Sequence, residues 1–99
     1  SGTEEYYSSL HGVTWIYPEL NEIEVNHRNY YIEFFIRQME RFGANGTTKQ
    51  WQDLATYLYI VEDELYSEPF NDVFSHQDAR SNLFKETMIF HLGKILPTS

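Results

Sequence analysis

The sequence predicts an all-α fold: a small bundle of three main helices with an irregular or partly helical N-terminal arm. Apolar residues recur at intervals of three and four in three separate stretches, the spacing of one helix face. Gly43 and Pro97 stand at the ends of the first and last stretches, and Thr47 opens a capping box at the start of the middle one. These boundaries place the helical core at residues 27–96 and the arm at residues 3–26.

Length and composition predict one domain over residues 1–99. A chain of 99 residues has room for one hydrophobic core, since domains are commonly about 100–150 residues long. Hydrophobic residues at 41% and aromatic residues at 17% suffice to fill it, which argues against intrinsic disorder despite a net charge of −8. Residues 1–2, Ser-Gly, resemble the remnant of a purification tag rather than part of the fold.

The arm, residues 3–26, is acidic and holds no lysine or arginine. Residues 13–17, Val-Thr-Trp-Ile-Tyr, favour an extended strand, and Pro18 ends any element that starts there. We expect an extended segment that lays Trp15 and Tyr17 over the core. A short β-hairpin in the arm is the main alternative.

The first core helix is predicted from near Asn26, a favourable cap residue, to Gly43. Residues 19–25 form either a short separate helix or a continuation of this one. At about 100° per residue it carries two apolar sides. One side holds Tyr31, Ile32, Phe35, Met39 and Phe42; the other holds Tyr30 and Phe34. A helix with two apolar sides is usually covered on both, so we expect this helix at the centre of the bundle.

The second core helix is predicted from the capping box of Thr47 and Gln50 to about Tyr66. It has the clearest amphipathic stripe in the chain: Trp51, Leu54, Leu58, Val61 and Leu65. Because a short loop joins it to the first helix, the two are expected to pack as an antiparallel hairpin.

The last core helix is predicted over Asp78 to Leu96, and Pro97 ends it. Its inward residues are Phe84, Met88, Leu92 and Ile95. Before it, Pro69 breaks the second helix, and a short turn at residues 70–74 closes the end of the bundle. Gly93 is expected to mark a close contact between helices.

Composition also limits the function. The chain has no cysteine, which excludes disulfides, zinc fingers and thiol catalysis and fits a cytoplasmic protein. No apolar run approaches the roughly 20 residues that cross a bilayer, so no membrane role is expected. Fifteen acidic residues against seven basic ones disfavour direct nucleic-acid binding and favour a basic protein partner.

Catalytic and metal-binding patterns are missing. Glu24 and His27 have the Glu-x-x-His spacing of helical metal sites, but no second pair accompanies them. There is neither a phosphate-binding glycine loop nor a nucleophile elbow. We therefore expect no enzyme activity, no cofactor and no metal. His91 is interpreted as a hydrogen-bonded core residue, and Glu62 as a half-buried acid paired with an arginine of a neighbouring helix.

The candidate partner-binding residues lie on the outer side of the second helix: Asp53, Tyr57, Ile60, Asp63 and Glu64. Four of them form one row at three-four spacing, with Asp63 beside it. A tyrosine and an aliphatic anchor among carboxylates are typical of protein interfaces, where the anchors hold the partner and the charges steer it. Two plainer interpretations are a solvated face with one stray isoleucine and a face covered by the arm.

Two further apolar pairs lie opposite the core stripes, Tyr30 with Phe34 and Leu83 with Phe90. They either meet within one subunit or are buried across a twofold axis, so a homodimer is possible.

The functional hypothesis is a non-enzymatic, protein-binding inhibitor. A small, acidic, tyrosine-rich helical chain without catalytic motifs is typical, by analogy of class alone, of an immunity protein that neutralises a basic toxin or nuclease. The alternative is a regulatory or scaffolding subunit that forms homo-oligomers or joins a larger complex. An adjacent gene for a large secreted toxin would favour the first, and a stable homo-oligomer without ligand the second.

Overall fold

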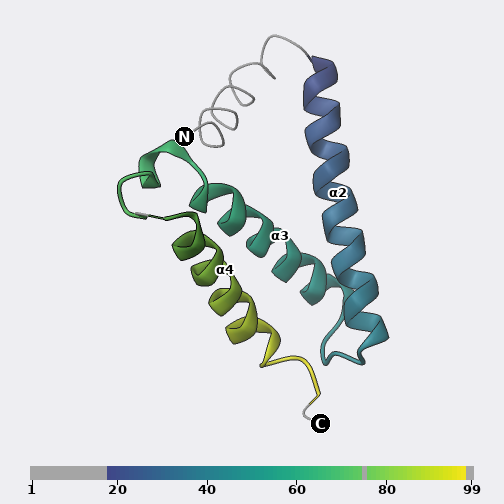
Figure 1. Cartoon of the computed structure of the whole chain (residues 1–99). Helices are drawn as coiled ribbons and strands as arrows, with labels where there is room; N and C mark the ends of the chain where they lie inside the picture. The colour runs from purple at the N-terminus through teal and green to yellow at the C-terminus, as the bar shows by residue number, and fades with distance from the viewer. Residues whose placement is uncertain (1–17, 75, 98–99) are drawn as a thin grey trace.

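The computed structural model describes residues 18–74 and 76–97 (Figure 1). These residues form helix α2 (Pro18–Arg41), helix α3 (Thr48–Leu65), the 3-10 helix η1 (Glu68–Phe70) and helix α4 (Gln77–Leu92). No strand occurs among them, and the α-helices contain more than half of the chain. The all-α prediction is confirmed. The expected placement of Trp15 and Tyr17 over the core falls outside the described residues.

Helix α2 begins at Pro18 rather than near Asn26. Proline is well tolerated in the first turn of a helix, where its missing N–H has no intrahelical partner and its fixed φ suits the helix. Residues 19–25 therefore continue the helix, and the core begins earlier than the predicted residue 27.

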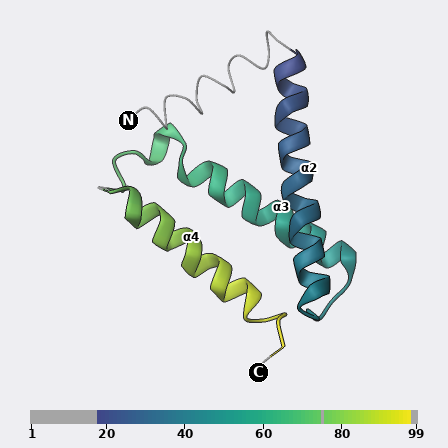
Figure 2. The same cartoon turned by 45° about the vertical axis from the view of Figure 1, so that its right-hand side comes forward.

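The central helix is α3, not α2. Figures 1 and 2 show α3 between α2 and α4, with α3 and α4 side by side and antiparallel. Tyr30 and Phe34, on the second apolar side of α2, are exposed, so the expectation that α2 is covered on both sides was wrong among the described residues. Phe42 is exposed as well, since the helix has already ended at Arg41.

The α2–α3 connection follows the predicted local chemistry. Gly43 has φ +66°, the left-handed conformation that ends helices without strain in glycine. The Thr47 side chain accepts a hydrogen bond from the Gln50 backbone N–H, and the Gln50 side chain accepts one from the Thr47 N–H at 2.8 Å. This capping box confirms the predicted start of α3.

The buried core contains few residues. Its fully or nearly buried apolar members come from α2 and α3: Phe35, Met39, Trp51, Ala55 and Leu58. Half-buried side chains from all three helices pack against it, among them the predicted Phe84, Met88, Leu92 and Ile95. The inward stripe of the last helix is therefore confirmed.

Helix α4 ends at Leu92, earlier than the predicted Leu96. Residues 93–95 continue as a turn, in which the Ile95 N–H donates to the Leu92 carbonyl at 3.1 Å. A Cβ on Gly93 would lie 3.0 Å from the Ile89 carbonyl oxygen of the same helix. Gly93 thus relieves crowding within its own helix end and does not mark a contact between helices.

The fold is open and thin. Its principal extents are 44 × 34 × 15 Å, and its radius of gyration of 15.5 Å exceeds the roughly 13 Å of a compact 100-residue domain. A thickness of 15 Å is little more than the 10–12 Å diameter of one helix. The helices therefore lie as a single layer, which leaves many large apolar side chains exposed. None of the described helices is long and apolar enough to cross a bilayer.

Candidate protein-binding face

The predicted row on α3 is an exposed surface. Tyr57 is 47% exposed and Ile60 is 59% exposed, and Asp53 and Glu64 are exposed beside them. Asp63 is half-buried and lies about 60–120° round the helix from these four, towards the side that faces α2. The structure therefore brings four of the five predicted residues together and sets Asp63 apart.

Helix α4 extends this row with aromatic rings. Tyr57 contacts His91 edge to face with ring centroids 5.2 Å apart, and His91 contacts Phe90 in the same manner at 5.3 Å. Phe90 is 61% exposed, and the Lys94 ammonium lies 4.0 Å from its ring centroid. His91 is thus a half-buried bridge between exposed rings rather than the core histidine that the sequence predicted.

The antiparallel register shows which other side chains belong to this surface. Tyr57 stands opposite His91, and Tyr66 Oη lies 3.3 Å from Ser81 Oγ. Glu64 is therefore level with Leu83, which lies one heptad before Phe90 and on the same side of α4. We call the α3/α4 face the set of exposed Tyr57, Ile60, Leu83 and Phe90 together with half-buried His91 between the rings.

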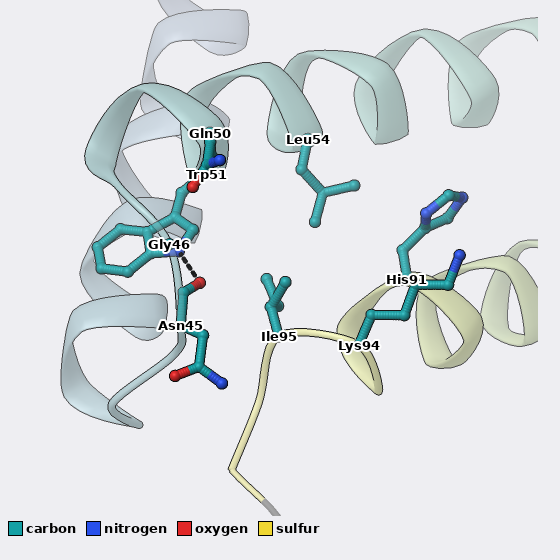
Figure 3. A pocket seen from close by; sticks show the side chains of 8 residues that line it. All are labelled: Asn45, Gly46, Gln50, Trp51, Leu54, His91, Lys94 and Ile95. Atoms are coloured by element: carbon teal, nitrogen blue, oxygen red, sulfur yellow. Dashed lines mark hydrogen bonds between the residues drawn. The ribbon is translucent and has the colours of Figure 1, made fainter.

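A hollow of about 350 Å³ adjoins this face at the end of the bundle (Figure 3). Leu54 and Ile95 point towards one another across it, and His91 and Lys94 come from the end of α4. Trp51 forms one wall, and its indole N–H donates to the Asn45 carbonyl at 3.0 Å. This hydrogen bond fixes the indole, so one wall of the hollow is held in place.

Charge on the α3/α4 face differs from the predicted acidic ring. Lys49 Nζ lies 2.6 Å from Asp53 Oδ1, so the Asp53 charge is compensated one helical turn away. Lys94 adds a second positive charge beside Phe90. Acidic residues gather instead at the other end of α3 and beyond it: Glu62, Asp63, Glu64, Glu68 and Asp72. The face is therefore apolar at its centre and acidic at one end.

A titratable cluster joins α2 to α3 on the side away from this face. His27 Nδ1 lies 3.3 Å from Tyr59 Oη, and the Tyr31 and Tyr59 rings meet edge to face at 5.2 Å. Burial raises the pKa of Glu62, His27 lowers it, and Asp63 raises it. The positive group that acts on Glu62 is therefore a histidine, not the predicted arginine. Burial also raises the pKa of Tyr31, and the Glu62 carboxylate and Tyr59 raise it further.

The raised pKa of Glu62 predicts a pH-dependent effect of Glu62→Gln. The folded chain binds this proton more tightly than the unfolded chain, so ionised Glu62 lowers stability as the pH rises above its ordinary pKa of 4.5. Glutamine removes that penalty. Thermal unfolding should show a stabilisation of at most about 1 kcal/mol at pH 8 and none near pH 4, because the group is only half-buried. An equal gain at both pH values would assign the effect to packing.

The described residues include no evident metal site. They contain no group of three histidine, aspartate or glutamate side chains arranged to hold a metal ion. No family model matches the chain, and no significant match exists among curated proteins or solved structures.

Sequence reasoning placed Tyr57 and Ile60 on one surface and Phe90 on another. These residues form one surface only because of the register in which α3 packs against α4. The helical spacing within either segment does not predict that register. The Lys49–Asp53 pair, by contrast, was readable from its four-residue spacing.

Proposed function

We propose that this chain is a non-enzymatic inhibitor that binds a basic protein through the α3/α4 face, in the manner of an immunity protein that neutralises a toxin or nuclease. The observation that supports it is the continuous group of exposed Tyr57 and Phe90 rings joined by half-buried His91, with Ile60 beside it and a hollow at its end. Aromatic anchors next to a preformed pocket are typical of the centre of protein interfaces. The absence of cysteine is consistent with action in the cytoplasm.

Electrostatics supports a basic partner at longer range. The net charge of −8 attracts positive proteins before contact, and the acids beyond Glu64 lie at the end of the α3/α4 face. Because Asp53 is already paired with Lys49, we assign slow dissociation of the complex to the apolar group and fast association to the acidic end.

The test begins with affinity capture from the native host at low salt, followed by kinetics with the purified partner. Tyr57→Ala, Ile60→Ala and Phe90→Ala should each raise the dissociation rate by about tenfold or more, since they remove anchors. Asp63→Lys with Glu64→Lys should slow association by about tenfold and weaken its salt dependence.

Glu33→Lys with Glu40→Lys is the matched control, because it makes the same change in net charge on exposed positions of α2. It should slow association less than the change at Asp63 and Glu64. A partner whose binding ignores all the substitutions on α3 and α4 would show that this face is only solvated surface. A partner that binds through the face but keeps its own activity would favour the alternative, a regulatory or scaffolding subunit.

A further inference from the structure

The outer side of α2 carries a regular row of exposed residues, which we call the α2 seam. Its members are Glu19, Ile23, His27, Tyr30, Phe34, Arg37 and Arg41. All are exposed, and His27, at the edge of the row, also contacts Tyr59 of α3. From Ile23 onward the steps alternate between four and three residues, which is the spacing of a helix that packs along another helix. The core residues Phe35 and Met39 lie on the other side of α2, against α3.

The α2 seam is apolar at its centre and oppositely charged at its two ends. Ile23, Tyr30 and Phe34 are 63%, 64% and 49% exposed, and the Tyr30 and Phe34 rings stack with centroids 6.5 Å apart. Glu19 lies at the N-terminal end, and Arg37 and Arg41 lie at the C-terminal end. The stretch from Glu19 to Arg41 is about 33 Å long at 1.5 Å per residue.

We propose that the α2 seam binds the α2 seam of a second copy of this chain, with the two helices antiparallel about a twofold axis. With the axis at Tyr30, each Glu19 stands opposite Arg41 of the other copy, and each Ile23 stands opposite the aliphatic stem of Arg37. The two Tyr30 rings meet at the centre, next to Phe34.

Charge complementarity favours a second copy of this chain as the partner of the α2 seam. An antiparallel second copy brings acid to base at both ends, whereas a parallel copy would set Glu19 against Glu19 and Arg41 against Arg41. A general basic partner would match only the Glu19 end. The contact is one helix wide, so it belongs to the smaller interface class, and we expect a dissociation constant in roughly the micromolar range. The inference concerns α2 alone and holds whether or not the α3/α4 face binds a basic protein.

The experiment is sedimentation equilibrium of the full chain from about 0.5 µM to about 1 mM, a range that brackets such an affinity. The wild-type protein should pass from monomer to dimer as its concentration rises. Tyr30→Asp should sediment as a monomer throughout, and its circular dichroism spectrum should show that it is folded. Glu19→Arg and Arg41→Glu should each raise the dissociation constant about tenfold, because each turns two attractive pairs into repulsive ones. The double variant should restore the wild-type value.

Mixing the two single variants gives the decisive result. One copy then has arginine at both ends and the other has glutamate at both ends, so a heterodimer should form more tightly than either homodimer. Arg28→Glu, an exposed charge reversal about 160° round α2 from Tyr30, is the matched control and should leave the dissociation constant within about twofold. A wild-type monomer at 1 mM would overturn the proposal, whether residues 1–17 or solvent cover the seam. A dimer that survives Tyr30→Asp would also overturn it, because such a dimer must use another surface.

Discussion

Replacing Leu58 by alanine is expected to lower the free energy of unfolding by about 2–5 kcal/mol. Leu58 is 0% exposed and is the one large side chain that is completely buried among the described residues. It lies on α3 between the core residues of α2 and the half-buried side chains of α4. Its truncation removes apolar contacts with both neighbouring helices and leaves a cavity that the rest of the layer can close only in part.

This loss should be a large fraction of the total stability. Small domains unfold at a cost of about 5–15 kcal/mol, and the part of this chain that the structure describes has only five buried apolar residues. Urea unfolding followed by circular dichroism should show a clearly lower midpoint for the variant. Its melting temperature should be at least about 8 °C below that of the wild type. Alanine is the better helix former, so the loss cannot come from helix propensity.

Ile60→Ala is the matched control for Leu58→Ala. It lies on the same helix, removes a side chain of the same size and is 59% exposed, so it should change stability by no more than about 0.5 kcal/mol. If Leu58→Ala costs less than that as well, the buried stripe of α3 has been misassigned.

The parts of the fold that the sequence predicted well are those decided locally. The start of α3 depends on hydrogen bonds between Thr47 and Gln50, three residues apart, and the end of α2 depends on the backbone freedom of Gly43. Both are properties of a few neighbouring residues. The predicted central position of α2 was wrong for the opposite reason. A second apolar side favours a cover over Tyr30 and Phe34, but helical spacing does not tell whether the same chain supplies it, and in the structure both side chains are exposed.

Only part of the candidate face was predicted, because the rest depends on how α4 packs against α3. Helical spacing placed Tyr57 and Ile60 on one side of α3, and the structure keeps them there. Joining them to Phe90 required the packing of α4, in particular the contact of Tyr57 with His91. The position of Arg80 was missed altogether, because an arginine near the start of an amphipathic helix is ordinarily solvated.

Arg80→Ala is expected to lower the free energy of unfolding by about 2–4 kcal/mol, from lost packing, cation–π contact and a charged hydrogen bond. Arg80 is only 3% exposed, and its guanidinium carbon lies 5.7 Å from the Tyr66 ring centroid and 5.5 Å from that of Phe74. One terminal nitrogen donates to Asn71 Oδ1 at 3.0 Å. The side chain therefore fastens the end of α3 and the η1 segment to the start of α4.

The conservative variant separates shape from charge. Arg80→Lys keeps the positive charge, but an ammonium is compact and lacks the planar fork that faces two rings while it reaches Asn71. It should still cost about 1–2 kcal/mol, whereas Lys85→Ala, an exposed change on the same helix, should stay within about 0.5 kcal/mol. A double-mutant cycle of Arg80→Ala with Phe74→Ala should give a coupling energy of about 0.5–2 kcal/mol. Full stability of Arg80→Lys, with no coupling to Phe74, would mean that the charge alone matters and that the rings are bystanders.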